Sequence, residues 1–309
     1  MQIAITGGTG FVGTALLRAL TKQHCQVKAL ARNPSKIEPA RNIEVIEGDL
    51  NNTSALHKLI ADCDVFIHLA GITHARKREE YFSVNRDAAR HLAELIRPTP
   101  VKLLHISSLS AREPRLSPYA QSKRESETAV AQILDQDRWL ALRLPAIYGD
   151  GDLVTLPFFK LVKSGIAPAP STTPPARASL LYVQDCADAI IAAARFAETG
   201  KVYDVGGDRE DGHSWEEIAT LLGQTLGKTP RKISIPKPVI AAYYAALRRV
   251  EEAMGDAPSV REGQVNELFH PDWVARENLL SKAIDWTPAH TLEQGFAKTA
   301  IWYQENKLI

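Results

Sequence analysis

The sequence predicts an α/β protein with a doubly wound parallel sheet, and three observations carry this prediction. The chain opens on a short apolar run, residues 3–6, that ends in closely spaced glycines. Short β-branched runs then alternate with segments whose apolar residues recur at helical spacing. Small or polar residues directly follow several of these runs. Strands that alternate with helices form parallel sheets, and such sheets bind ligands beyond the carboxyl ends of their strands.

The composition excludes several classes of function. The 309 residues are 45% apolar and 24% charged, which is ordinary for a globular protein. A net charge of +1 provides no field that would attract nucleic acid or an anionic membrane, so we expect neither as a partner. Cys25, Cys63 and Cys186 are odd in number and lie in no metal-ligand spacing, which predicts unreactive thiols and no metal site. No apolar run is long enough to span a membrane, and a strand from residue 2 leaves no room for a signal peptide, so we expect a cytoplasmic protein.

The first candidate site is the glycine-rich turn between the strand at residues 3–6 and a helix at residues 11–20. Glycines at this point allow a sharp turn, close approach of a diphosphate and tight packing of the helix on the strand. The free amides of the first helical turn then face the phosphates. An ordinary glycine-rich turn is the alternative, but the flanking strand and helix favour a dinucleotide site. The predicted cofactor-binding residues of this turn are Gly7, Thr9, Gly10, Phe11, Val12 and Gly13.

The end of the second predicted strand, residues 26–31, bears on the choice of cofactor. NAD-binding units usually carry an acidic residue there, which binds the ribose 2′-hydroxyl. This chain has Ala31 followed by Arg32, whose guanidinium can pair with a 2′-phosphate. The sequence therefore favours NADP(H) over NAD(H), with a solvated loop charge as the alternative interpretation of Arg32.

Further candidate residues follow the later strands. Strands are expected at residues 44–47, 64–69 and 102–107, and a long amphipathic helix at residues 81–96. Asp49 can accept a hydrogen bond from an adenine amino group while Leu50 packs on the ring. Because carboxyl ends of parallel strands meet at one edge of the sheet, the residues at these ends are expected to line one site. Besides Asp49 and Leu50, they are Leu69, Ala70, Gly71, Ser107 and Ser108.

A candidate catalytic group follows the fifth strand. Tyr119 and Lys123 are four residues apart in a helical pattern, so both lie on one face of the helix. A phenol titrates near pH 10, and a nearby ammonium would bring it into the working range of an acid or base. Ser108, at the preceding strand end, can hold a substrate oxygen. Tyr303 and Lys307 repeat the spacing near the C-terminus, but no strand end with a serine precedes them, so we interpret that pair as a chance match.

Short motifs spread over nearly the whole chain are typical of one family. They are residues 6–13, 48–50, 69–71, Asn85, 107–108, Tyr119-x-x-x-Lys123, 143–149, 182–185, 285–288 and 291–295. In combination they resemble the extended short-chain dehydrogenases/reductases, a family of nucleotide-sugar epimerases, dehydratases and ketoreductases. The resemblance implies that Tyr119 is the acid/base, that Lys123 lowers its pKa and binds the nicotinamide ribose, and that Ser108 positions the substrate oxygen. It also implies that Asn85 helps to order the site and that Pro145 and Ala146 border the nicotinamide. Tyr148 is expected to contact the substrate.

The chain departs from the family pattern in three places. Only 11 positions separate Ser108 from Tyr119, so the intervening loop is short. Leu109 and Ser110 stand where sugar 4,6-dehydratases carry an acidic pair, which argues against dehydration, and Ala31 stands where NAD-specific epimerases keep an acid. These departures favour an NADP(H)-dependent oxidoreductase that reduces a carbonyl or oxidises a hydroxyl, with a nucleotide-sugar epimerase as the close alternative. The alternative of another class is a non-catalytic NADP-binding sensor or assembly protein, which the presence of serine, tyrosine and lysine together disfavours.

The second half of the chain is expected to bind the substrate. We predict a Rossmann-type NAD(P)-binding domain of residues 1–163 and 178–205, and a smaller α/β substrate-binding region of residues 164–177 and 206–309. The proline-rich residues 164–177 are expected to form a mobile loop over the site. Arg177 is either a clamp for a substrate diphosphate or a plain surface arginine.

Two predictions concern the surface. The apolar helix at residues 238–254 can be a lid or a subunit contact, but burial against the smaller region is the favoured interpretation. A homodimer through the helices around Asn85 and Tyr119 would be usual for the family. The expected partner in solution is a small-molecule carbonyl compound or a nucleotide sugar.

Overall fold

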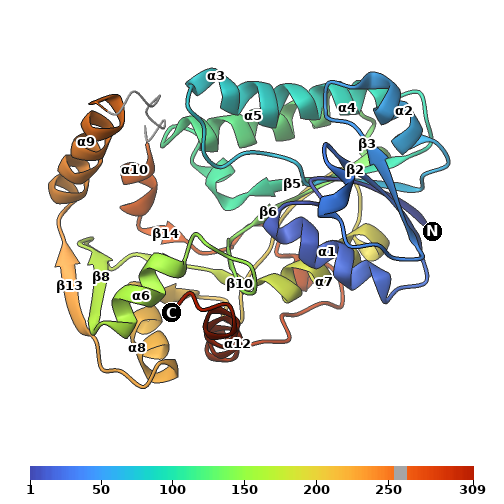
Figure 1. The fold of residues 1–309 in the computed structure, drawn as a ribbon. Coiled ribbons are helices and arrows are strands. Elements are labelled where there is room, and N and C mark those ends of the chain that lie inside the picture. Colours follow the sequence, from blue (N-terminus) through green and yellow to red (C-terminus); the bar gives the residue numbers. More distant parts are fainter. Residues whose placement is uncertain (254–262) are drawn as a thin grey trace.

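A computed structural model describes residues 1–253 and 263–309 of the chain (Figure 1). Its centre is a seven-stranded sheet in the order β11-β6-β5-β4-β1-β2-β3, in which every neighbouring pair is parallel. The strands are β1 (Gln2–Thr6), β2 (Gln26–Ala31), β3 (Ile43–Glu47), β4 (Val65–His68), β5 (Lys102–Ser108), β6 (Trp139–Leu144) and β11 (Lys201–Asp204). The predicted doubly wound parallel sheet is therefore confirmed.

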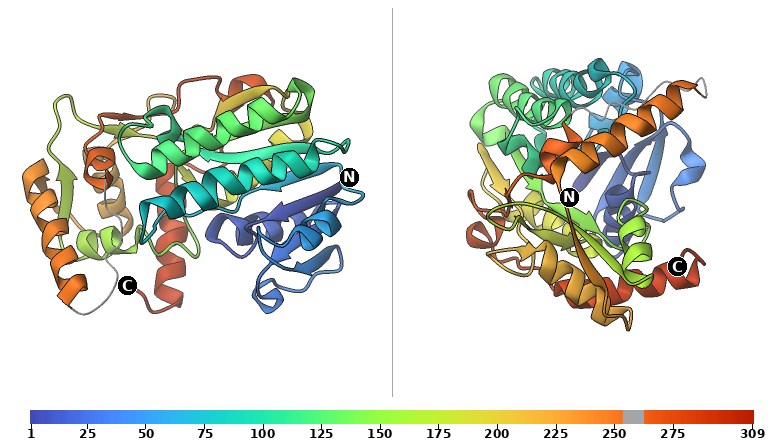
Figure 2. Two further views of the ribbon diagram at one scale, coloured as in Figure 1. Left: turned by 90° about the horizontal axis from the view of Figure 1, so that it is seen from above. Right: turned by 90° about the vertical axis from the view of Figure 1, so that its left-hand side faces the viewer.

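Helices cover both faces of this sheet (Figure 1). On one face, α1 (Phe11–Thr21) and α7 (Val183–Phe196) pack through Leu16, Leu20 and Ile190 against the strands. On the other face lie α2 (Thr53–Ile60), α4 (Ala88–Ile96) and α5 (Pro118–Ile133), and the last two run side by side in Figure 2. Because β4 and β6 are buried on both faces, their residues are apolar almost throughout, as expected for inner strands of a parallel sheet.

The helix predicted at residues 81–96 is interrupted. A short α3 (Arg78–Tyr81) leads into a π-helical segment, Phe82–Asp87, before α4 begins. Asn85 lies in the π-helical segment with its side chain buried. Such wide turns shift the register of a helix face and are frequent at functional sites, and sequence periodicity does not reveal them.

The C-terminal region is built from small sheets and helices around a second core. It contains the pairs β10 (Leu180–Tyr182) with β7 (Ala146–Tyr148) and β13 (Arg231–Ile235) with β8 (Ile166–Pro170), and the sheet β12 (His213–Ser214), β9 (Arg177–Ala178) and β14 (Asp272–Trp273). The helices α6 (Leu156–Lys163), α8 (Trp215–Thr225) and α12 (Leu292–Glu305) bury Phe159, Leu222 and Phe296 between them. A further short helix, α11 (Leu280–Ala283), precedes α12.

The prediction of a loop over residues 164–177 is wrong for residues 166–170, which form strand β8. Pro168 and Pro170 oppose Ile233 and Ile235 of β13 in a parallel pair. Proline lacks an amide donor, but residues two apart in a strand point their amides the same way. Both prolines can therefore face the free edge of this two-stranded ribbon, where no donor is needed.

The prediction that the apolar helix at residues 238–254 is buried is also wrong. The structure describes it as α9 (Lys237–Ala253), whereas Met254 lies outside the described residues. Val239, Tyr243 and Val250 expose more than half of their surface, and α9 stands at the end of the molecule beside β13 (Figure 1). Among the described residues, no helix is both long and apolar enough to cross a membrane. The three cysteines are buried and unpaired.

Candidate active site

The glycine turn between β1 and α1 forms a close-packed cradle. Gly7 has φ +80°, and a Cβ built on it would lie 2.6 Å from the Ala70 amide nitrogen. A Cβ on Gly13 would lie 2.1 Å from the Gly7 carbonyl oxygen, so neither position tolerates a side chain. Helix α1 begins after Gly10 with no side-chain cap and no acidic residue in its first turn. The amides that follow, including those of Phe11 and Val12, are thus available to an anion such as a diphosphate.

The other predicted cofactor residues lie at the same edge of the sheet. Arg32 directly follows β2 with an exposed side chain, and the structure records no partner for it among the described residues. Asp49 follows β3 and accepts a hydrogen bond from the Asn51 amide at 2.8 Å, while Leu50 packs partly against the core beneath α2 and α4. Leu69, Ala70 and Gly71 follow β4.

Asn85 holds the loop that follows β4. Its Oδ1 accepts from the Ile72 amide at 2.9 Å, and its Nδ2 donates to the Ile72 carbonyl at 3.1 Å and to Ser122 Oγ at 2.9 Å. A Cβ on Gly71 would lie 2.9 Å from the Asn85 Oδ1. Asn85 therefore ties this loop to α5.

Ser108 and Tyr119 meet across a short, capped turn. Ser108 ends β5, and Ser117 caps α5 by accepting from the Ala120 amide at 2.9 Å, which places Tyr119 in the first turn of the helix. Burial raises the pKa of Tyr119 to about 12, and a hydrogen bond with the Ser108 side chain acts in the opposite direction. The carboxylate of Glu267 raises this pKa further. The phenol is consequently protonated at neutral pH.

Lys123 lies one turn further along α5, with its ammonium buried. Its Nζ donates to the Ile106 carbonyl at 2.8 Å and would lie 3.6 Å from a Cβ on Gly71. Burial lowers the pKa of Lys123 to about 8, while the carboxylate of Glu127 opposes that shift. The lysine thus joins the β4 loop to β5, and its effect on the Tyr119 pKa stays a prediction.

Two buried histidines beside Lys123 were not predicted from the sequence. His68 Nδ1 lies 2.8 Å from Thr6 Oγ1, and His105 Nε2 lies 2.8 Å from Ser126 Oγ. Burial lowers the pKa of His68 to about 3 and holds that of His105 far below its ordinary value, with Lys123 adding to both shifts. The sequence signal was a histidine inside each of two apolar strands.

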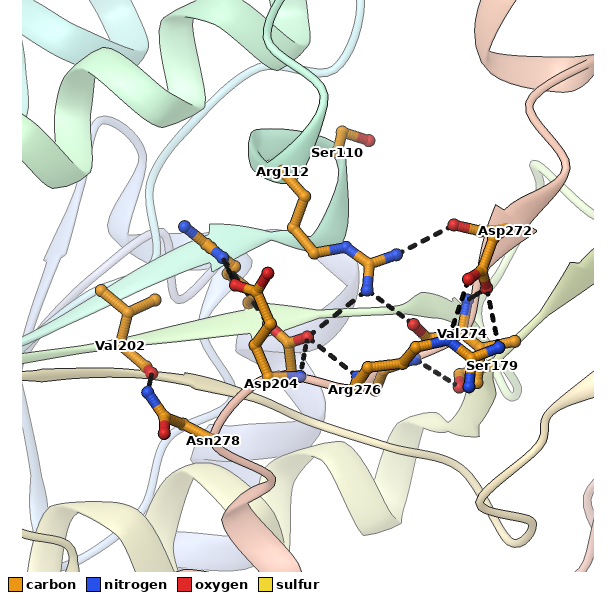
Figure 3. A network of polar contacts seen from close by, with 12 residues as sticks. Ser110, Arg112, Ser179, Val202, Asp204, Asp272, Val274, Arg276 and Asn278 are labelled. Atoms are coloured by element: carbon orange, nitrogen blue, oxygen red, sulfur yellow. Dashed lines mark hydrogen bonds and ion pairs between the residues drawn. The ribbon is translucent and has the colours of Figure 1, made fainter.

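A polar network fastens the loop after Ser108 to the C-terminal region (Figure 3). Arg112, at the end of that loop, donates to the carbonyls of Val274 at 2.7 Å and Asp272 at 2.9 Å, and lies 3.6 Å from the Asp204 carboxylate. Asp204 also accepts from the Arg276 amide at 3.1 Å. The segment after β14 is thereby held against the end of β11 and the active-site loop.

Three of the predicted site residues use their side chains elsewhere. The Ser107 hydroxyl donates to Glu127 at 2.5 Å beneath the sheet, because alternate residues of a strand point to opposite faces. Tyr148 is fully buried in the C-terminal core, where its ring packs on Phe296. The predicted substrate contact of Tyr148 is therefore corrected to a packing role. Arg177 pairs with Asp211 at 2.9 Å and with Glu217 at 3.3 Å, which favours the surface-arginine interpretation.

The remaining two predicted residues lie next to each other after β6. Pro145 is buried, and Ala146 opens β7 with an exposed side chain. They follow the strand that neighbours β5, so they lie at the same carboxyl edge of the sheet as Ser108. A cofactor ring at that edge could contact them without obstruction by a larger side chain.

The chain is similar to proteins of known name. A model of the "NAD dependent epimerase/dehydratase family" matches residues 3–206. A ceramide reductase of Caulobacter vibrioides is 37% identical over 307 residues, which are 98% of this chain and 94% of that protein. A UDP-glucuronic acid 4-epimerase of Bacillus cereus, solved with UDP-glucuronic acid and NAD, superposes with a TM-score of 0.76 at 21% identity over 99% of this chain and all of that one. A mitochondrial NADH dehydrogenase 1 alpha subcomplex subunit 9 of Arabidopsis thaliana is 25% identical over 92% of this chain and 73% of its own.

Proposed function

The chain belongs to the NAD-dependent epimerase/dehydratase family, and we propose that it is an NADP(H)-dependent carbonyl reductase within that family. The observation that carries the proposal is the buried Tyr119 hydroxyl in hydrogen-bond contact with the Ser108 side chain, a position in which burial raises the pKa of Tyr119 and favours the protonated phenol. Reduction of a carbonyl consumes one proton at its oxygen, and a protonated phenol is the form that can supply it. The 37% identity to a ceramide reductase supports the same direction of reaction.

The glycine turn fits a dinucleotide, because Gly7 and Gly13 allow it to pack directly on the backbone of Ala70 and on the Gly7 carbonyl. This close packing brings the free amides at the start of α1 to the end of β1, where a diphosphate would lie. The uncapped start of α1 offers its amides to the phosphates, and Ala70 and Gly71 leave room beside β4. Lys123 would hold the nicotinamide ribose, with Pro145 at the ring. When bound, NADPH supplies the hydride that attacks the carbonyl carbon.

The residues of this chain handle the carbonyl oxygen. Ser108 donates a hydrogen bond that orients the oxygen, and Tyr119 transfers its phenolic proton to it. The Lys123 pKa of about 8, lowered by burial, keeps most of the ammonium charged at pH 7. That charge stabilises the phenolate that remains after proton transfer.

The preference for NADP(H) rests on Arg32. No acidic residue follows β2 to accept from a ribose 2′-hydroxyl, and the exposed Arg32 guanidinium is available to a 2′-phosphate. The absence of a carboxylate at this point also removes a negative charge that would repel the 2′-phosphate of NADP(H).

For the substrate, we propose a lipid ketone of the ceramide type rather than a nucleotide sugar. The relative that covers 98% of the chain is named for ceramide, whereas the epimerase likeness at 21% identity concerns the fold alone. The ion pairs of Arg177 with Asp211 and Glu217 leave it poorly suited to clamp a diphosphate. The epimerase stays the second candidate.

The test combines native mass spectrometry with an activity assay. The purified full chain is examined for retained cofactor and then given NADPH or NADH with a short-chain ketoceramide. We expect an empty protein that oxidises NADPH in preference to NADH and forms the alcohol, identified by mass. Tightly retained NAD⁺ together with interconversion of UDP-sugars would instead identify an epimerase. Tight NADPH binding without oxidation across a wide panel of carbonyl compounds would indicate the non-catalytic alternative.

A further inference from the structure

A small cavity opens beside Tyr119. Its volume is about 190 Å³, and it is formed by the loop after β4, the start of α5 and the short helix α10 (Gln264–Leu268). Aromatic rings and a few polar groups line it, a combination that suits a small ligand with hydrogen-bonding groups. The lining residues are Thr73, His74, Tyr81, Ser117, Tyr119, Gln264 and Glu267.

Glu267 is held in this cavity by two elements. Its Oε1 accepts a short hydrogen bond from the Ser117 hydroxyl, the same group that caps α5. Trp273 Nε1 donates to the Glu267 carbonyl at 2.8 Å and so fixes the backbone of α10. Gly263, with φ +86°, lets the chain approach α5 so closely that a Cβ there would lie 2.2 Å from the Leu116 carbonyl oxygen. The carboxylate is thereby held at Ser117, which lies two residues before Tyr119 in the cavity wall.

The carboxylate has unused capacity to accept hydrogen bonds. Within the described residues, the only donor recorded for it is Ser117, and no lysine, arginine or histidine forms an ion pair with it. An ionised carboxylate can accept about four hydrogen bonds, and a half-buried one that lacks them loses stability. Burial accordingly raises the pKa of Glu267, with Ser117 acting against that shift.

We propose that Glu267, held by Ser117, is a substrate subsite that accepts a hydrogen bond from a hydroxyl, amide N–H or ammonium group carried next to the reacting carbonyl. The inference rests on the proposed function and specifies its substrate class. A ketone with such a donor gains a charge-assisted hydrogen bond, whereas a ketone with a methyl group at that point leaves the carboxylate unpaired. A ketone with a neighbouring carboxylate is rejected by like charge.

A matched set of three ketones tests the subsite. The set is 1-hydroxydecan-2-one, undecan-3-one, in which a methyl replaces the hydroxyl, and 2-oxodecanoate, in which a carboxylate replaces the hydroxymethyl group. We expect kcat/KM with NADPH to favour the hydroxyketone over undecan-3-one by about tenfold to a hundredfold, as one charged hydrogen bond provides. In Glu267→Leu this ratio should approach one through a higher KM for the hydroxyketone, while the value for undecan-3-one changes little. Glu267→Gln, which keeps an acceptor oxygen, should restore part of the ratio.

The control is Glu125→Gln, a change on α5 outside the cavity that should leave the ratio intact. A binding measurement separates a failure of the proposed reductase function from a failure of the Glu267 subsite. If the wild type reduces none of the ketones, the proposed function fails, and the affinities of decane-1,2-diol and undecan-3-ol for the NADP⁺-loaded protein decide the subsite. A diol preference that Glu267→Leu abolishes would support it. Equal affinities, equal kcat/KM values, or a ratio unchanged in Glu267→Leu would overturn it.

Discussion

The imidazoles of His68 and His105 stack with ring centroids 5.5 Å apart and an interplanar angle of 27°. They oppose each other in the register of β4 and β5, beneath the face that α5 covers. His68 Nε2 and His105 Nδ1 are buried without a recorded partner. Two neutral histidines next to the Lys123 ammonium make the interior of the site sensitive to acid.

This histidine pair predicts a loss of stability between pH 7 and pH 5. The folded-state pKa of His68 is lowered to about 3, so below pH 6.5 the unfolded chain binds a proton that the folded chain does not. Stability is therefore complete above pH 6.5 and falls as pH drops, by about 2 kcal/mol for His68 at pH 5, and the lowered pKa of His105 acts in the same direction. Urea unfolding of His68→Phe should show a smaller difference between pH 7 and pH 5 than the wild type. His57→Phe, on the exposed side of α2, is the control, and equal pH dependence in His68→Phe and the wild type would contradict the prediction.

Tyr119→Phe should lower kcat by about a hundredfold to ten-thousandfold, because the proton donor is lost. The dissociation constant of NADPH, measured by fluorescence titration, should change little. Tyr303→Phe is the matched control, since Tyr303 and Lys307 share the same spacing but the Tyr303 hydroxyl donates to the Asp152 carbonyl at 2.7 Å, in the C-terminal core. Loss of activity in Tyr303→Phe with retention in Tyr119→Phe would reverse the assignment.

Arg32→Ala should raise the dissociation constant of NADPH by about tenfold or more and leave that of NADH within twofold. The reason is the loss of a charge-assisted hydrogen bond to a 2′-phosphate that NADH lacks. Isothermal titration measures both constants. Arg41→Ala is the control, because Arg41 precedes β3 at the amino edge of the sheet, opposite the cofactor edge. Equal weakening of NADH and NADPH would remove the assignment of Arg32.

Glu127→Ala should destabilise the protein by about 3 to 5 kcal/mol, because it removes the buried carboxylate that accepts two hydrogen bonds from the Arg143 guanidinium. The exposed Glu277 at 3.2 Å and Asp204 at 3.9 Å then remain as the only recorded carboxylates near that guanidinium among the described residues. Arg143 and Glu127 form two hydrogen bonds of 2.9 and 2.8 Å, and only 5% of either side chain is exposed. The exposed pair of Lys201 with Glu198 offers the comparison, since Glu198→Ala should cause no measurable change. Denaturant unfolding at pH 7 compares the two variants, and a Glu127→Ala change as small as that of Glu198→Ala would contradict the prediction.

Arg177→Ala should lower the melting temperature without altering the substrate KM. The guanidinium bonds the Asp211 and Gly212 carbonyls at 2.8 Å each, so its removal should cost roughly 1 kcal/mol. Calorimetry and steady-state kinetics measure the two quantities. An increased KM with an unchanged melting temperature would favour the diphosphate clamp instead.

Local patterns predicted the part of the fold that local forces determine. The glycine turn, the strands around it and the spacing of Tyr119 and Lys123 follow from steric limits and periodicity within a few residues. The order β11-β6-β5 places a late strand beside an early one, and the sequence suggested it through the assignment of residues 178–205 to the NAD(P)-binding domain.

The errors arose where distant segments meet. The pairing of β8 with β13 depends on a partner that the chain provides more than 60 residues away, and no local pattern contains that information. The exposure of Val239, Tyr243 and Val250 on α9 likewise depends on which elements pack against that helix. Glu267 was missed because it approaches Ser117 from 150 residues further along the chain. The direction of the Ser107 hydroxyl was not foreseen, because strand pleating, rather than position at a strand end, decides which way it points.

The late arrival of β11 has a consequence for biosynthesis. Strand β6 is buried along its whole length, yet its outer neighbour is made only after residue 201 has been translated. Until then the nascent chain presents an apolar edge strand that can pair with other chains. The carboxylate of Asp204 acquires its amide partners at Arg276 and Glu277 later still. Co-translational folding of the nucleotide-binding sheet therefore ends near the C-terminus, and holdase chaperones that shield β6 should raise the yield of native protein.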